Sequence, residues 1–388
     1  MSFLKSPKSQ ALALIFASFL GLTLANFGAE SFLRDFEAID LPTPFMSLTV
    51  AGWVFNFGIP LFFATVGLEL RREFTHGTFS APQKVLVPAL AAMGGVLLPG
   101  AIYLLVIFCA TGTTDSTLAF GWPIPTATDV TFSLAVLLLF GKNLPPTART
   151  FLLAFAVIDD VIGIVLITGL FGQSIQPVPA MLALLSLVAF ASLAFIYGRF
   201  RTSRTTFSNI FWVLGFTLLA LLALGETVIS GLQPTLTGVL LGLLVPLGAN
   251  NRTESILQPW VGFLVLPFFA LFSTSIYLRH SAVLGDPVFW AVALRPIGKF
   301  IGIVSGAWLG YRMVGSFEGL SLGHIARVAW LGGIGFTVSL LMSSLAFALE
   351  PARYIAAVAA TLLASLASMV VGAIALVRTH GAKATHRA

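Results

Sequence analysis

Apolar runs of about 20 residues alternate with short polar connectors along most of the chain. A helix rises about 1.5 Å per residue, so a run of this length matches a hydrocarbon core of about 30 Å. Strand-like alternation is absent, which favours spanning helices over an outer-membrane barrel. The pattern predicts twelve membrane helices, at residues 10–28, 52–71, 84–109, 118–140, 148–171, 178–198, 207–224, 227–246, 256–278, 287–311, 325–348 and 354–377.

The composition supports an all-α polytopic membrane protein. Of the 388 residues, 57% are hydrophobic and only 9% are charged, which is more apolar surface than one soluble core of this length can hide. The 36 glycines and 20 prolines fit this class, because neighbouring membrane helices can satisfy the backbone groups that these residues free. No low-complexity linker or soluble segment appears, so residues 1–388 are predicted to form a single transmembrane transporter domain.

The basic residues predict the orientation of the chain. Sixteen of the 21 lie in connectors on the side of the two termini, whereas Arg34, Arg279 and Arg353 lie on the opposite side. Because cytoplasmic connectors carry the excess of Lys and Arg, both termini are expected in the cytoplasm. The same residues form no basic stripe, so no nucleic-acid partner is expected.

Two of the predicted helices are interrupted near mid-length. In the fourth, GWPIPTATD (121–129) has two prolines before Asp129, and in the eleventh, GGIGFTVS (332–339) has three glycines. These helices are the middle members of two triplets. Interrupted helices at matching places in two halves are typical of inverted-repeat transporters with the site at the breaks. We therefore expect inverted repeats near residues 84–171 and 287–377.

Five charged residues remain inside the apolar windows: Asp129, Asp159, Asp160, Arg295 and Lys299. Each charge inside a membrane costs on the order of 2.5–3.5 kcal/mol even on the lenient insertion scale. One interpretation is that they form static ion pairs that join helices. Five costly charges from three helices at one predicted depth favour a transport site instead.

The stretch AFAVIDDVIG (154–163) places two acids side by side in an apolar run. Neighbours on a helix point about 100° apart, so Asp159 and Asp160 cannot both face one partner. One can face a water-filled cavity while the other faces the bundle, or both can flank a cation. Two close carboxylates outside bulk water resist double ionisation. The pair is therefore expected to hold either protons or a cation.

Hard oxygen ligands in this region suit a small alkali cation as the transported substrate. The Thr128 hydroxyl and carbonyls freed at the breaks are candidate ligands beside the two acids. Asp129 is at least as well placed to balance the charge of half-helix ends, and Lys299 is a second candidate for that role. All five histidines lie in connectors or the tail, so zinc or iron is not expected. No phosphate loop or nucleophile–base constellation supports an enzyme or an ATPase, so we expect secondary transport without a cofactor.

The motifs PIPTATDV (123–130), AVIDDVIG (156–163), RPIGKFIG (295–302), GGIGFTVSLLMSSLAF (332–347) and VGLELRREF (66–74) together resemble the NhaA family of bacterial sodium/proton antiporters. The resemblance runs in order through nearly the whole chain. It implies an inner-membrane protein whose fourth and eleventh helices cross at mid-bilayer. It also implies Asp159 and Asp160 as cation and proton carriers, with Thr128 and Asp129 at the break.

The resemblance further implies Lys299 as the partner of an aspartate in the inward-facing state. It implies electrogenic exchange of two inward protons for one outward Na⁺ or Li⁺. Members of this family carry a cytoplasmic cluster tied to pH activation, whose matching positions here are Glu69, Arg72, Glu73 and Glu254. Solvated charges at helix ends are an equal alternative for these four.

The chain departs from the family pattern at several positions. Gln233, Ser255 and Gln258 replace histidines, which predicts weaker or shifted pH activation. Asn56 replaces an aspartate. Arg295, one turn from Lys299, is unexpected, and pairing with an acid would change the stoichiometry. The segment LPTPFMSLTV (41–50) is short and proline-rich where the family forms a dimerising hairpin, so it gives weaker support for a homodimer.

Two rival functions stay open at this stage. A secondary transporter of another solute, such as an organic anion, predicts a larger apolar or basic cavity near Arg295. A channel or a purely structural membrane protein predicts buried charges that are static.

Overall fold

Helices form most of the computed structural model, and the residues it describes contain a single two-stranded hairpin. Nine described helices are long and apolar enough to cross a membrane, and a bent pair makes ten if it counts as one span. The prediction of a helical polytopic membrane protein is confirmed. The described residues are 7–28, 30–43, 46–76, 82–113, 116–171, 176–199, 206–277, 280–315, 317 and 319–377.

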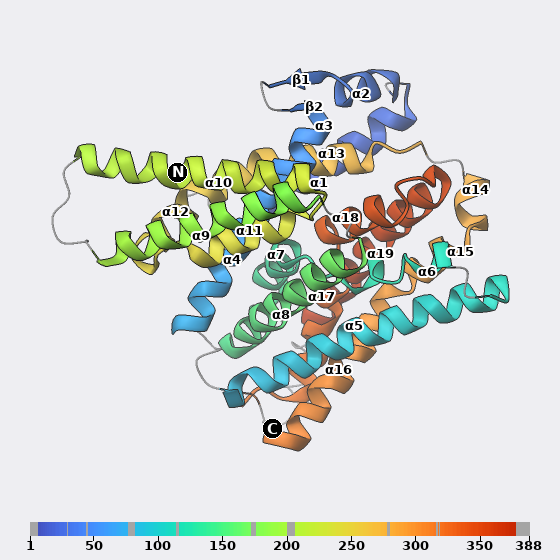
Figure 1. Ribbon diagram of the computed structural model, residues 1–388. Coiled ribbons are helices and arrows are strands. Elements are labelled where there is room, and N and C mark those ends of the chain that lie inside the picture. Colours follow the sequence, from blue (N-terminus) through green and yellow to red (C-terminus); the bar gives the residue numbers. More distant parts are fainter. Residues whose placement is uncertain are drawn as a thin grey trace.

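The elements follow one another along the chain as Figure 1 shows. They are α1 (Pro7–Asn26), α2 (Glu30–Glu37), β1 (Asp40–Pro42), β2 (Ser47–Thr49), α3 (Val50–Trp53), η2 (Val54–Gly58), α4 (Ile59–His76), α5 (Pro82–Thr111), α6 (Ser116–Ala119), η4 (Ile124–Thr126), α7 (Val130–Phe140), α8 (Pro146–Leu170), α9 (Pro177–Arg199), α10 (Thr206–Ser230), α11 (Pro234–Leu244), α12 (Leu247–Trp260), η5 (Val261–Val265), α13 (Leu266–Thr274), α14 (His280–Gly285), α15 (Pro287–Ala293), α16 (Arg295–Val314), α17 (Leu322–Gly332), α18 (Thr337–Ala346) and α19 (Pro351–Val377).

In two of the twelve predicted helices, the apolar segment among the described residues is shorter than a full span. These segments are Leu12–Asn26 within α1 and Pro234–Leu244, which is α11. The predicted boundary between residues 224 and 227 is wrong, because α10 continues to Ser230. Gly231 then takes a positive φ of 78°, and Pro234, whose fixed φ suits a first helical turn, begins α11. The count of twelve spans stays a prediction.

Both predicted interruptions occur. The fourth helix divides into α6, the short η4 and α7, with Ala127 and Asp129 in extended conformations before α7 begins. Pro123 and Pro125 explain this break, because proline lacks an N–H donor and disfavours the helical conformation in the residue before it. In the eleventh helix, α17 and α18 bend by 49° across a break of at most 4 residues.

Helices α5 and α16 pack along each other, side by side in Figure 1. Gly298, Gly302, Gly306 and Gly310 recur once per turn on α16 and form a stripe of small residues. A Cβ at Gly302 would overlap the carbonyl of Gly94 on α5. Small residues at this spacing let helix backbones approach closely in membranes, so the stripe fixes α16 against α5.

Valine in place of Gly302 is expected to force these two helices apart. Overpacking of a filled contact destabilises by about 1–3 kcal/mol, and here the obstacle is backbone rather than a movable side chain. Thermal unfolding of purified protein in detergent would measure the loss. Gly169→Val is the matched control, because a Cβ at Gly169 of α8 meets nothing within 4 Å. Equal melting temperatures for the two variants would contradict this account of the contact.

The segment between α2 and α3 forms the hairpin, at one end of the bundle in Figure 1. Strands β1 and β2 are antiparallel, with Leu41 opposite Leu48. Next to the hairpin, the Glu37 carboxylate accepts a hydrogen bond of 2.8 Å from Ser275 Oγ at the end of α13. Burial raises the pKa of Glu37 above its usual range, against the opposing effect of the Ser275 bond. The pairing of β1 with β2 shows that the proline-rich segment 41–50 takes part in a hairpin, although a short one.

Candidate functional site

Helix α8 carries the two adjacent acids in the interior of the protein. Asp159 is 2% exposed and Asp160 is 7% exposed. Their side chains diverge as expected for helical neighbours. Asp160 lines a cavity, whereas Asp159 contacts Lys299 of α16. Asp160 therefore borders a cavity that can hold water, whereas Asp159 is enclosed by protein and paired with Lys299.

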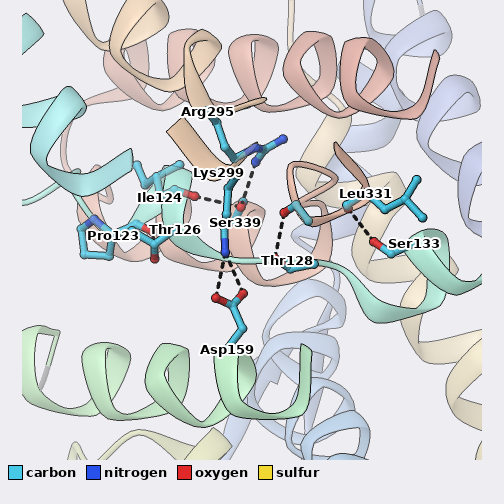
Figure 2. A network of polar contacts seen from close by, with 11 residues as sticks. Pro123, Ile124, Thr126, Thr128, Ser133, Asp159, Arg295, Lys299, Leu331 and Ser339 are labelled. Atoms are coloured by element: carbon cyan, nitrogen blue, oxygen red, sulfur yellow. Dashed lines mark hydrogen bonds and ion pairs between the residues drawn. The ribbon is translucent and has the colours of Figure 1, made fainter. Parts of the chain in front are cut away.

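Asp159 and Lys299 form a buried ion pair. The Lys299 ammonium donates to both carboxylate oxygens of Asp159, at 2.8 and 2.9 Å, and Figure 2 shows the lysine reaching from α16 toward α8. The ammonium also lies 5.5 Å from the centre of the Phe155 ring. Good geometry is needed here, because two desolvated charges are stable only when their attraction and hydrogen bonds offset the loss of water.

The cavity has a volume of about 240 Å³, which is ample for several water molecules. It connects exposed Arg72 and Arg149 with buried Asp160 and Asp129. Its other lining residues are Gln10, Phe62, Thr65, Val66, Glu69, Thr128, Val130, Thr131, Leu134, Leu153, Val157, Glu254, Gln258, Val261, Gly262, Leu266, Thr337 and Val338. The buried end of the cavity therefore reaches Asp160 and both breaks, but not Asp159.

Asp129 binds the first amides of two half-helices. Its Oδ1 accepts hydrogen bonds from the N–H groups of Thr131 and Phe132 in α7, at 3.1 and 3.3 Å. Its Oδ2 accepts the N–H and the hydroxyl of Thr337 in α18, at 3.2 and 3.0 Å. A carboxylate at a helix N-terminus is stabilised by the partial positive charge there. One carboxylate thus contacts the N-terminal ends of two half-helices.

Direct hydrogen bonds join the two breaks to each other. Each bond links the chain near residues 124–133 with the chain near residues 331–339, and several are drawn in Figure 2. They are Thr128 Oγ1 to Gly332 O at 2.8 Å, Ser133 Oγ to Leu331 O at 2.8 Å, the Asp129 N–H to Ile334 O at 2.6 Å, and Ser339 Oγ to Ile124 O at 2.9 Å. Thr128 therefore lies at the break as expected, with its hydroxyl hydrogen committed to a carbonyl.

Sequence reasoning missed several hydroxyl groups near the breaks. Ser133 ties α7 to α17, and Ser365 of α19 accepts a hydrogen bond of 2.7 Å from the Arg295 guanidinium. Thr361 supplies a carbonyl to the same guanidinium. The signal was present but weak: Thr361 and Ser365 are polar residues one turn apart within the apolar helix α19, a spacing that places them on one face.

Three members of the candidate pH cluster, Glu69, Arg72 and Glu254, line the same cavity. Arg72 Nη1 lies 3.4 Å from Glu254 Oε2, with side chains 48% and 17% exposed, and an exposed pair of this kind contributes about 0–1 kcal/mol. Glu69 lines the cavity nearby. The side chain of Glu73 lies outside the described part of the chain.

The positions that depart from the family pattern are placed as follows. Gln233 donates from Nε2 to the carbonyl of Phe171 at 3.1 Å. Asn56 donates to the carbonyl of Gly52 within its own helix at 2.9 Å. Gln258 lines the cavity, and Ser255 lies in α12.

Sequence and structure comparisons relate the chain to known transporters. The model of a family described as Na⁺/H⁺ antiporter 1 matches residues 1–376. The Na⁺/H⁺ antiporter NhaA 2 of Clavibacter michiganensis is 38% identical over 355 residues, covering 89% of this chain and 84% of the relative. The Na⁺/H⁺ antiporter NhaA of Tropheryma whipplei is 34% identical over 384 residues, covering 98% of this chain and 96% of the relative.

A solved structure of the sodium proton antiporter MjNhaP1 from Methanocaldococcus jannaschii has a similar fold. The TM-score is 0.59 with 18% sequence identity, over 95% of this chain and 97% of the other. At that identity the likeness concerns the fold alone.

Proposed function

The chain belongs to the family of NhaA sodium/proton antiporters, and we propose that it expels Na⁺ or Li⁺ in exchange for two inward-moving protons per cation. Proteins of this family are transporters and not enzymes. The observation that carries the proposal is the division of the adjacent acids: Asp160 lines a cavity of about 240 Å³, while Asp159 is held by a buried lysine.

Competition at Asp160 couples the two ions in this mechanism. A carboxylate that is accessible to water binds either a proton or a cation, because binding of one removes the charge that attracts the other. The carboxylate of Asp160, together with Thr128 and nearby carbonyls at the breaks, offers the hard oxygen ligands that alkali cations require. Na⁺ that enters through the cavity displaces the proton from Asp160, and reprotonation on the other side releases the Na⁺.

The second proton is assigned to the Asp159–Lys299 pair. Asp159 can join Asp160 in binding a cation only after its ion pair with the Lys299 ammonium has broken. A proton is exchanged at the Asp159–Lys299 pair in that step. Two protons against one Na⁺ move one net charge per cycle. Transport then responds to the membrane potential, at about 2.3 kcal/mol per charge per 100 mV.

The proposed architecture is a single transporter domain, residues 1–388, with twelve spans and inverted repeats near 84–171 and 287–377. Two features support it. Helices α5 and α16 belong to the leading spans of the two repeats and pack together, and the two breaks bond to each other. In this arrangement the fourth and eleventh helices cross at mid-bilayer, where the site lies.

The proposed location is the bacterial inner membrane with both termini in the cytoplasm, from the excess of Lys and Arg in the connectors on that side. Arg72 of α4, Arg149 of α8 and Glu254 of α12 line the cavity and lie close to those connectors in the sequence, which supports a cavity open to the cytoplasm. Glu69, Arg72 and Glu254, which line the cavity, together with Glu73, are the proposed pH-regulating residues. The hairpin at the opposite end is the proposed contact of a homodimer.

An organic anion is a poorer fit to this site. Arg295 is absent from the cavity lining, and the innermost charged groups of the cavity are Asp160 and Asp129. A carboxylate-lined cavity attracts cations and repels anions.

Everted membrane vesicles with an imposed proton gradient test the proposal. Addition of Na⁺ or Li⁺ is expected to release protons and restore the fluorescence of a quenched pH probe, across a series from pH 6 to pH 9. Choline chloride and vesicles without this protein serve as controls. An absence of any cation-dependent response at every pH would refute the antiporter function.

A further inference from the structure

Among the residues that the structure describes, Arg295 is a buried cation without a carboxylate partner. It begins α16, one turn before Lys299, and is 1% exposed. The sequences of α5, α15, α17, α18 and α19 contain no Asp or Glu. The charged groups that interact with Lys299 are Asp159 and Asp160 of α8 and Arg295 itself, and Asp129 at the first break interacts with Asp160. Of these, Asp159 is already paired with Lys299.

The guanidinium instead reaches the carbonyls of both breaks through two serine hydroxyls. Arg295 Nη1 donates to Ser339 Oγ at 3.1 Å, and Ser339 Oγ donates to Ile124 O in the first break at 2.9 Å. Arg295 Nη2 donates to Ser365 Oγ at 2.7 Å, and this hydroxyl lies 2.8 Å from Gly335 O in the second break. A single positive charge is therefore linked to the carbonyl side of both interruptions.

The chain at the second break is packed directly against this charge. A Cβ at Gly335 would lie 2.7 Å from Arg295 Nη1, so only glycine allows the approach. Arg295 Nε has no hydrogen-bond partner within the described residues. A buried cation with an unsatisfied donor destabilises a fold, so a contribution to stability does not by itself account for an arginine here.

Lys299 makes different contacts from the same helix. Its hydrogen bonds within the described part of the chain are to the two carboxylate oxygens of Asp159. In Figure 2, Lys299 extends to α8, while the guanidinium of Arg295 stays beside the breaks. Asp129 accepts hydrogen bonds from the backbone amides that begin α7 and α18. Arg295, by contrast, is linked through serine hydroxyls to backbone carbonyls at the two breaks.

We propose that Arg295 is a positioning residue for transport: its fixed charge balances the carbonyl side of both helix breaks and so leaves Lys299 free to hold and release Asp159. This inference rests on the proposed exchange mechanism. Without the charge at Arg295, the carbonyls of the breaks would compete with Asp159 for the Lys299 ammonium. The site would also lose a positive charge that opposes its protonation.

Three variants separate the charge from the hydrogen bonds. Arg295→Gln removes the charge, Arg295→Lys keeps it without the forked geometry, and Ser365→Ala removes one hydroxyl link with the charge intact. The readout is the pH at which Na⁺-driven proton release in everted vesicles is half-maximal, at equal amounts of protein. Arg295→Gln is expected to move this pH upward by on the order of one unit. Arg295→Lys and Ser365→Ala are expected to keep the native pH profile.

Several outcomes would overturn the inference. A native pH profile for Arg295→Gln would do so, as would a shift in Ser365→Ala that equals the shift in Arg295→Gln. If Arg295→Gln does not reach the membrane, Arg295→Lys carries the test alone, and an upward shift of about one unit in that variant contradicts the role of the charge.

A failure of the proposed function would look different. In that case native vesicles would give no Na⁺ response at any pH.

Discussion

Replacement of Asp160 by asparagine is expected to abolish Na⁺-dependent and Li⁺-dependent proton exchange. Asparagine has nearly the same size, so the cavity of about 240 Å³ should keep its shape. The amide neither binds a proton in the physiological range nor offers the negative charge that attracts a cation. Both ions would lose their shared binding group at once, and the expected activity is that of vesicles without the protein.

The fluorescence assay in everted vesicles would measure this loss, with the amount of protein in the membrane checked for each variant. Glu350→Gln is the matched control, because it also removes one negative charge but lies at the end of the bundle beside Arg353. The control should keep its activity. If Asp160→Asn kept a substantial Na⁺ response, Asp160 would not be the group for which the ions compete.

Replacement of Asp159 by asparagine is expected to stop charge movement, whereas Lys299→Ala should chiefly lower stability and weaken coupling to voltage. Each change leaves one partner of the buried pair alone. Removal of one member of a buried ion pair destabilises by about 3–5 kcal/mol. Asp159 is expected to be the more serious loss for transport, because it also completes the carboxylate pair that takes the cation.

Two measurements separate these effects. Currents evoked by a Na⁺ jump in reconstituted membranes report charge movement, and thermal unfolding in detergent reports stability. The double variant Asp159→Asn with Lys299→Ala should be more stable than the two single losses predict, because neither charge is then left unpaired. Native currents in Asp159→Asn would exclude the assigned role of this residue, and additive stability losses would exclude energetic coupling of the pair.

The burial of Asp159 and Asp160 could be anticipated from the sequence, because two charged residues inside a long apolar run must lie within the bundle. Asp159 and Asp160 stood out from an apolar run, and the 100° helical step predicted their different surroundings. The breaks followed from Pro123 and Pro125 in one helix and from three glycines in the other. These signals are local, so a single sequence carries them.

The partners across the bundle were harder to predict, because tertiary packing decides them. Nothing local distinguishes the aspartate that binds Lys299 from its neighbour, and the contacts of Arg295 with Ser365 and Thr361 involve helices about 70 residues apart in the chain. Small hydroxyl residues such as Ser133 occur throughout apolar helices without a role that spacing would reveal. The boundary between α10 and α11 was misplaced because hydropathy averages over the turn at Gly231.

The double attachment of Asp129 restricts how this protein can move. One carboxylate holds the starts of both α7 and α18, so separation of the two half-helices would strand several donors in a medium of low polarity. We therefore expect α7 and α18 to move together as one rigid unit. The relative motion during transport would then take place between this unit and the helices that surround it.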